Sequence, residues 1–236
     1  SLITITATGE VVANGAVIEV TAGPGDITIT GDSANLRNSM LNAGEIRIET
    51  LSETLVSVDC TLTFTTKLEI EGRSSFGSGV ALFNPTLNSV AGTISIIGFA
   101  NFPSSLINAV VIDDAQFNQP LTILGTHAFG GTGCLLTSFG ASADTDVTCT
   151  TTNSVAAKVQ GPITFQNGVH NLTANAPGGM GWMIEGILSV TDATLRISGS
   201  GHQGVEHTAM NLLRSQVTLV GSSTGSGQSS FYGVAS

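Results

Sequence analysis

The sequence predicts an all-β fold: a single-stranded, right-handed parallel β-helix of about ten coils, with residues 1–236 forming one solenoid domain. Three observations support this prediction: a recurring strand pattern that often ends in glycine, a second apolar segment between its copies, and a near absence of helix signals. Each repeat is too short to bury its apolar face alone, so neighbouring repeats must share one continuous core. The right hand follows from the rule for parallel crossover connections.

The strand pattern reads apolar, any, apolar, any and, in its clearest copies, glycine. Those copies are Ile27–Gly31, Leu68–Gly72, Leu121–Gly125, Leu195–Gly199 and Val217–Gly221. Looser copies begin at Ile3, Ile46, Ile94, Val147 and Ile163. The starts lie about 24 residues apart on average, a spacing typical of solenoids. We expect the glycine to form a corner of each coil, where a positive φ is needed.

Alternation along each strand predicts which residues face the core. The expected inward stack is Ile27, Ile46, Leu68, Ile94, Leu121, Val147, Ile163, Leu195 and Val217. The second apolar segment begins at Val80, Leu106, Cys134, Val155, Trp182, Met210 and Phe231. Each repeat is therefore expected to hold at least two short strands.

Other segments are expected to be loops. Residues 32–43 begin with an Asp cap but have too few periodic apolar residues for a helix, and predict a lateral loop or one helical turn. Insertions rich in Gly, Pro or Ser are expected at Arg73–Gly79, Gly98–Ser104, Phe129–Gly133, Asn175–Gly181 and Gly199–Thr208. Loops of this kind often carry function in solenoids.

The charge balance argues against several partners. Seven Lys and Arg stand against seventeen Asp and Glu, for a net charge of -10. Proteins that bind nucleic-acid backbones or anionic membrane surfaces present basic patches. We therefore expect neither nucleic-acid binding nor membrane insertion. No apolar run reaches the roughly 18 residues of a membrane span, and no signal peptide is visible. No motif predicts a cofactor or a metal.

Cys60, Cys134 and Cys149 give an odd number of cysteines without metal-binding spacing. Cys149 occupies the second apolar position of its repeat, so we expect buried filler rather than a disulfide framework. The chain ends at Phe231–Ser236 with what reads as the first strand of another unit. We therefore expect a fragment of a longer chain. A coil cut open leaves an unpaired strand edge, which predicts self-association or packing against a following domain.

The repeats resemble the right-handed parallel β-helix (pectin-lyase-like) superfamily. That group includes pectin and pectate lyases, polygalacturonases, bacteriophage tailspikes and bacterial adhesins. The irregular repeats, without an enzyme signature, look most similar to tailspikes, phage appendages and viral spike shafts. The resemblance implies carbohydrate contact along one outer face, an extracellular or virion-surface location and a homotrimer.

Two segments of the chain resemble parts of an enzyme signature. Gly199–Gly204, which contains His202, and the pair Asp113 and Asp114 are similar to elements of polygalacturonases. They lie about four coils apart at this repeat length, whereas the family needs adjacent coils. In the alternative of a polysaccharide lyase or glycoside hydrolase, the catalytic candidates are Asp144, Asp146 and Asp192.

The register of the repeats predicts a polar column on the outer surface, three residues before each strand pattern. Its members are Asn118, Asp144, Gln160, Asp192 and Arg214. Two coils would separate Asp144 from Asp192 by about 10 Å, near the upper end of the gap between the carboxylates of inverting glycosidases. The predicted carbohydrate-binding residues are Asp144, Gln160, Asp192, Arg196 and Arg214.

A threonine ladder is also expected on the outside, from Thr4, Thr28, Thr122, Thr148, Thr164 and Thr218. Regular threonine arrays are typical of ice-binding solenoids, although Arg47, Glu69 and Arg196 interrupt this one. Arg47 and Glu69 are expected to form a surface ion pair. The favoured function is recognition of a host surface glycan. A polysaccharide-degrading enzyme is the alternative, and a structural or ice-binding solenoid is the third interpretation.

Overall fold

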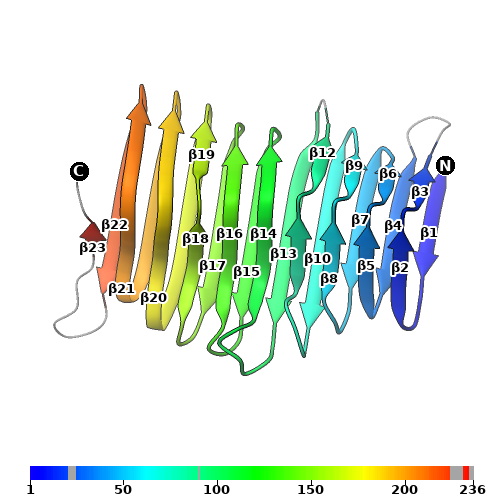
Figure 1. The fold of residues 1–236 in the computed structure, drawn as a ribbon, viewed down its shortest axis with the longest axis horizontal. Helices are drawn as coiled ribbons and strands as arrows, with labels where there is room; N and C mark the ends of the chain where they lie inside the picture. The colour runs from blue at the N-terminus through cyan, green and yellow to red at the C-terminus, as the bar shows by residue number, and fades with distance from the viewer. Residues whose placement is uncertain (21–24, 90, 224–230, 234–236) are drawn as a thin grey trace.

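The computed structural model describes residues 1–20, 25–89, 91–223 and 231–233, without the side chains of 56–58, 207–208 and 231–233. In these residues every regular element is a strand. Figure 1 shows the strands stacked along one long axis from the N-terminus to the C-terminus. The predicted all-β parallel solenoid is confirmed, with about nine turns.

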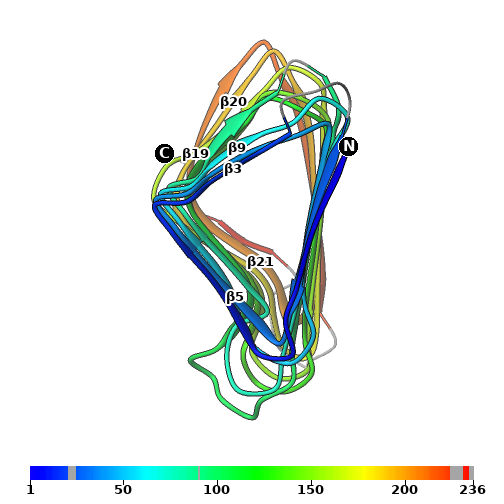
Figure 2. The ribbon, with the colours of Figure 1, turned by 90° about the vertical axis from the view of Figure 1, so that its right-hand side faces the viewer.

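Each coil contributes strands to three faces, which give the triangular cross-section of Figure 2. The first face holds β1 (Leu2–Thr6), β4 (Asp26–Gly31), β7 (Glu45–Thr50), β10 (Lys67–Ser74), β13 (Thr93–Ala100), β15 (Leu121–His127), β17 (Thr145–Thr151), β22 (Gln216–Ser223) and the beginnings of β20 (Val169–Thr191) and β21 (Thr194–Leu213).

The second face holds β2 (Glu10–Asn14), β5 (Ser33–Arg37), β8 (Leu55–Val58), β11 (Val80–Phe83), β18 (Val155–Gln160), β23 (Phe231–Gly233), the beginnings of β14 (Asn108–Phe117) and β16 (Thr132–Ala141), and the middles of β20 and β21. The third face holds β3 (Val17–Glu19), β6 (Met40–Asn42), β9 (Thr61–Thr63), β12 (Thr86–Asn88), β19 (Ile163–Gln166) and the ends of β14, β16, β20 and β21.

Every pairing between coils is parallel, and most run without a register shift. In Figure 2 the N-terminal coil faces the viewer and the chain winds clockwise as it recedes, which makes the solenoid right-handed. Because each coil pairs mainly with its two neighbours, side chains at one register position form a column along the axis.

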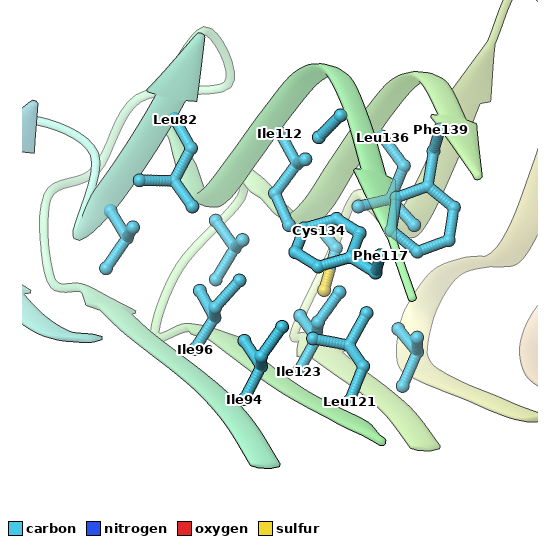
Figure 3. Packing of buried hydrophobic residues seen from close by; sticks show 14 of the residues in the cluster. Leu82, Ile94, Ile96, Ile112, Phe117, Leu121, Ile123, Cys134, Leu136 and Phe139 are labelled. Atoms are coloured by element: carbon cyan, nitrogen blue, oxygen red, sulfur yellow. The ribbon is translucent and has the colours of Figure 1, made fainter. Parts of the chain in front are cut away.

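The core fills the triangle with apolar side chains from all three faces. Figure 3 shows Leu121 and Ile123 of the first face packed opposite Ile112 and Leu136 of the second, with Phe139 beside them. The predicted inward stack is confirmed as buried, with Val217 partly buried. Two members stand elsewhere than expected, because Val147 pairs with Ile123 rather than with Leu121, and Ile163 lies on the third face.

The prediction that the pattern's glycines form positive-φ corners is wrong. Gly72 and Gly125 lie inside strands, at the narrow edge where the first and second faces converge. A Cβ at Gly72 would lie 2.0 Å from the carbonyl oxygen of Gly79 on the facing segment. Glycine is therefore needed here for close approach of two backbones.

Seven residues with positive φ instead form a column at the corner that follows the second face. This corner column consists of Gly15, Asn38, Asp59, Asn84, Asp114, Ser138 and Gly161. Short polar side chains tolerate this conformation better than other residues. Two neighbours in the column also interact, since Asn84 Nδ2 donates a hydrogen bond of 2.7 Å to Asp59 Oδ1.

Cys149 is buried as expected, but it is not filler, because it forms a disulfide. Cys149 pairs with Gly125 in the narrow-edge column, and its Cα lies 5.6 Å from that of Cys134 on the second face. The two form a disulfide across the core. The first and second faces approach closely along this column of glycines, so a cysteine in the column can bond to a cysteine on the second face. Cys60 is buried in the core.

Several expected loops are strands. Residues 32–43 contain β5 and β6 rather than a lateral loop or helical turn, because Ala34, Leu36 and Leu41 face the core. Loops do occur at 75–79, 101–107 and 128–131, and the exposed Leu106 belongs to one of them rather than to a strand. The insertions expected at Asn175–Gly181 and Gly199–Thr208 instead lie within β20 and β21.

Candidate functional site

Of the predicted polar column, Asp192 and Arg214 do lie at one register position. Both have positive φ at the corner that follows the third face. The guanidinium of Arg214 donates from Nε to Asp192 Oδ1 at 2.6 Å and from Nη2 to Oδ2 at 2.7 Å. These hydrogen bonds lower the pKa of Asp192. The two charges therefore neutralise one another at an exposed corner.

Asp144 does not share that column. It directly precedes Thr145, which aligns with His170 and then Leu195, whereas Asp192 lies three residues before Leu195. Its Oδ1 accepts a hydrogen bond of 2.8 Å from the amide of Val169. The expected alignment of Asp144 above Asp192 is therefore wrong, and these two carboxylates are not a matched pair across two coils.

Gln160 lies at the end of the second face, next to the corner column. It pairs with Thr137 and Glu185, and its Nε2 donates to Glu185 Oε2 at 3.0 Å. Glu185 also forms an ion pair of 3.1 Å with Lys158, and these two partners lower the pKa of Glu185. Gln160 thus belongs to a cluster on a different face from Arg196.

Arg196 lies on the outer surface of the first face. Its column also contains Thr122, Asp146, Asn171 and Thr218. Asn171 Nδ2 donates to Asp146 Oδ1 at 2.9 Å. Arg196 is exposed, and none of the residues described offers its guanidinium an ion pair, so it can bind an anionic or hydroxyl-rich ligand.

Hydroxyl and amide groups dominate the outer surface of the first face from β15 to β22. We call this surface the polar platform; its outward residues are Thr122, Leu124, Thr126, Asp146, Thr148, Thr150, Asn171, Thr173, Asn175, Arg196, Ser198, Ser200, Thr218, Val220 and Ser222. The expected threonine ladder is only partly aligned, because Thr148 stands one column away from Thr122 and Thr164 lies on the third face.

Side chains of neighbouring coils are linked across the platform. Thr150 Oγ1 donates to Thr126 Oγ1 at 3.2 Å, and Ser200 Oγ donates to Asn175 Oδ1 at 2.8 Å. A third link joins the hydroxyls of Ser198 and Thr173 at 3.2 Å. These links restrict the rotamers of the groups, so the platform offers a pre-ordered array of donors and acceptors.

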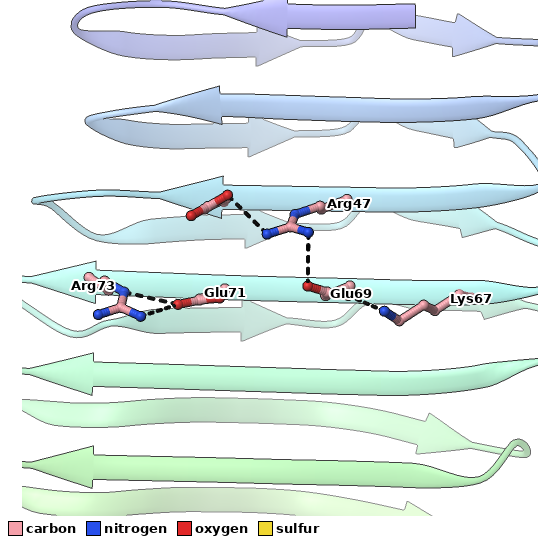
Figure 4. A network of polar contacts seen from close by, with 6 residues as sticks. Arg47, Lys67, Glu69, Glu71 and Arg73 are labelled. Carbon is pink, nitrogen blue, oxygen red and sulfur yellow. Dashed lines mark hydrogen bonds and ion pairs between the residues drawn. The ribbon is translucent and has the colours of Figure 1, made fainter. Parts of the chain in front are cut away.

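The N-terminal part of the same face is charged instead. Figure 4 shows Glu69 contacted by both Arg47 and Lys67. Arg47 also forms an ion pair of 3.2 Å with Glu49. The predicted pair of Arg47 and Glu69 is confirmed at 3.5 Å. The hydrogen bond from Lys67, together with the charges of Lys67 and Arg47, holds the pKa of Glu69 below its usual value. The charges of Arg47, Lys67, Glu49 and Glu69 therefore compensate one another within this network.

The second face carries a hollow of about 550 Å³ that the sequence did not indicate. Its lining includes Glu10, Asp32, Ser33, Glu53 and Phe76. We call it the acidic groove. The only sequence signal for it was the loop expected at Arg73–Gly79, since the other lining residues come from separate coils.

His127 and His170 are two further titratable groups, and both are buried in the solenoid. His127 Nδ1 accepts hydrogen bonds of 3.2 Å from the amides of Phe129 and Gly131, and so orders the loop at 128–131. His170 lies against Phe165, with its Nε2 2.6 Å from the carbonyl oxygen of Asn167. Burial lowers the pKa of both imidazoles, which keeps them neutral near pH 7.

The polygalacturonase-like elements do not form a site. Asp114 belongs to the corner column, whereas His202 is exposed on β21, several coils further on. Within the described residues no group of three or more His, Cys, Asp or Glu side chains could hold a metal ion. The same residues include no helix of the length and hydropathy needed to cross a membrane.

Comparison with models of known protein families, with curated protein sequences and with solved structures finds no match for this chain.

Proposed function

We propose that this chain is an extracellular or virion-surface solenoid module, of the phage spike or adhesin type, that binds a surface glycan through the polar platform. The observation that supports this proposal is the ordered array of hydroxyl and amide groups over β15 to β22. A polysaccharide presents hydroxyls along an extended chain, so successive coils can hydrogen-bond successive sugars. Arg196 adds the one guanidinium of the array, which suits a carboxylate-bearing sugar.

The Cys134–Cys149 disulfide supports the proposed setting, because disulfides persist in oxidising compartments and are rare in the cytosol. Binding roles for Asp144, Gln160, Asp192 and Arg214 remain predictions. The contacts described above engage three of them with neighbouring side chains and Asp144 with a backbone amide.

A panel of bacterial and plant surface polysaccharides tests the proposal by affinity electrophoresis. We expect Arg196→Ala and Thr173→Ala to weaken binding of the retained polysaccharide about tenfold or more together, a loss of about 1.4 kcal/mol. Thr164→Ala is the matched control, since Thr164 lies on the third face. Retention of no polysaccharide, or equal losses in control and platform variants, would contradict the proposal.

The enzyme alternative is tested in the same incubations by measuring reducing ends and unsaturated products. We expect neither to accumulate. Steady release of either would instead favour a hydrolase or a lyase, and Asp146→Asn would then be the first variant to examine because Asp146 lies on the platform.

Ice binding is a second candidate, favoured by the regularity of the same platform. Coils repeat about every 4.8 Å, and alternate residues along a strand lie about 6.6 Å apart, so the platform side chains stand on a two-dimensional grid in which hydroxyls occupy many of the positions. Thermal hysteresis separates the two candidates. Hysteresis that Thr173→Lys abolishes, without polysaccharide retention, would support ice binding and refute glycan recognition.

Self-association, as a homotrimer or with a following domain, also remains a prediction. Sedimentation velocity at tens of micromolar measures it directly, and a monodisperse monomer would contradict the trimer.

A further inference from the structure

We propose that the acidic groove is a second ligand site, which binds a hydroxyl-rich ligand carrying an ammonium group, such as an oligomer of glucosamine. The groove lies on the second face and shares no residue with the polar platform. The inference therefore does not depend on the proposed glycan recognition by the platform.

The floor of the groove is built from outward positions on successive coils. Glu10 pairs with Ser33, and Thr54 precedes Leu55, which pairs with Ala34. The next outward residue of β5, Asn35, continues the floor. The hydroxyls of Ser33 and Thr54 therefore stand one coil apart, and the amide of Asn35 lies two residues from Ser33 on the same strand, so the groups can face successive hydroxyls of a sugar chain.

The wall of the groove is the loop at 75–79, which is held in place from both sides. Ser74 Oγ accepts hydrogen bonds from the amides of Phe76 at 3.3 Å and Gly77 at 2.8 Å. The ring of Phe102 packs 6.3 Å from the ring of Phe76, centroid to centroid. Phe76 is nevertheless 74% exposed, so its position is fixed while most of its surface stays open to a ligand.

Three carboxylates surround this floor without compensating charge. The described residues offer no ion pair or side-chain hydrogen bond to Glu10, Asp32 or Glu53. Backbone hydrogen bonds place them on adjacent coils, from the Glu53 amide to the Asp32 carbonyl at 2.8 Å and from the Asp32 amide to the Gly9 carbonyl at 3.0 Å. Like charges one coil apart repel one another, and an ammonium group between them removes that repulsion.

Ser33 supplies an independent sign of a ligand. Ala34 and Leu36 of β5 face the core, so Ser33 points outward into the groove, yet it is only 8% exposed. The described residues provide no hydrogen-bond partner for its hydroxyl. This hydroxyl is not among the atoms closed off from the surface, so it is open to the groove, where a hydroxyl of a bound ligand would satisfy it.

The groove therefore combines three features that an amino sugar matches. The carboxylates suit the ammonium group, the floor suits the hydroxyls, and the exposed ring of Phe76 suits either the apolar face of a pyranose or the cation. An acidic sugar is excluded by charge. A lysine side chain would satisfy the carboxylates but offers no hydroxyls to Ser33, Asn35 and Thr54.

Isothermal titration calorimetry with three probes tests the inference: triglucosamine, its fully N-acetylated counterpart and trilysine. We expect triglucosamine to bind at least tenfold more tightly than either of the others, and more weakly as salt is raised. Equal binding of the acetylated trimer would refute recognition of the ammonium group. Tighter binding of trilysine would assign the groove to a basic peptide, and absence of heat from all three would refute the site.

Variants locate the binding. Glu53→Gln and Phe76→Ala should each weaken triglucosamine about tenfold, while Asp113→Asn and Phe129→Ala, which remove a carboxylate and an exposed ring outside the groove, should not. Arg196→Ala should also leave this binding unchanged, which separates the groove from the platform. Equal losses in the control variants would place the triglucosamine elsewhere. Far-UV circular dichroism of each variant confirms that the solenoid is intact.

Discussion

Replacing Gly72 by alanine should destabilise the solenoid clearly. Gly72 is buried in β10, at the narrow edge where the first and second faces converge. A Cβ there would lie 2.0 Å from the Gly79 carbonyl oxygen, 2.6 Å from its carbonyl carbon and 2.9 Å from Val80 Cγ2. The closest neighbours are backbone atoms, so a change of side-chain rotamer cannot relieve the clash.

The geometry gives the size of the effect. Real Cβ atoms essentially never approach another atom closer than 3.0 Å, so the segment entering β11 has to move by about 1 Å. β11 is paired with β8 on one side and β14 on the other, and the movement strains both neighbours. Overpacking of this kind costs about 1–3 kcal/mol, or a fall in Tm of about 2–12 °C for a chain of this size.

Urea unfolding followed by far-UV circular dichroism measures the loss as a lower midpoint. The matched control is Gly130→Ala, because no heavy atom lies within 4 Å of the position that its Cβ would take. If both variants unfold at the same urea concentration, the close approach of the two faces is wrong. The explanation of the whole glycine column would fail with it.

Three further predictions concern the core. Ile123→Ala should lower the free energy of unfolding by about 2–5 kcal/mol, because Ile123 is fully buried. Thr122→Ala, at an outward position, should lower it far less. Equal urea midpoints for the two variants would show that the register is shifted. The Cys134–Cys149 disulfide closes a loop of 15 residues, so its reduction should lower the free energy of unfolding by about 3 kcal/mol. An unchanged Tm in reductant would contradict this stabilisation by the disulfide. Burial lowers the pKa of His127 and of the second buried imidazole in the folded state. Their contribution to stability is therefore complete above the unfolded pKa of about 6.5 and is lost as pH falls below it; a urea midpoint that does not drop between about pH 7.5 and pH 5 would refute their burial as neutral groups.

Alternation of apolar and polar residues was enough to predict the fold and most of the core. It failed where the inward column itself becomes polar. Thr145 and His170 occupy the positions that Leu121 and Leu195 occupy in other coils, and both are buried with local backbone partners. A search for apolar residues therefore began that coil two residues late, at Val147, and misplaced the outward columns.

Glycine was ambiguous for a physical reason. Both a positive φ and a close backbone approach require the absence of a Cβ, and Gly72 serves the second need while Asn84 and Asp114 serve the first. Only the distance between two faces decides between these roles, and sequence spacing does not contain that distance. The disulfide was missed for the same reason, and the acidic groove because its lining comes from segments far apart in the chain.

The disulfide also determines how the solenoid would respond to a pulling force. Coils that pair mainly with their neighbours can peel away one at a time, and each releases its full contour length. The Cys134–Cys149 bond joins β16 to β17 near the middle of the stack, so the segment between these two cysteines, which are 15 positions apart in sequence, stays closed. That bond withholds about 50 Å of extension. A particle or cell tethered through this chain would therefore have a shorter reach, set by the redox state of one pair of cysteines.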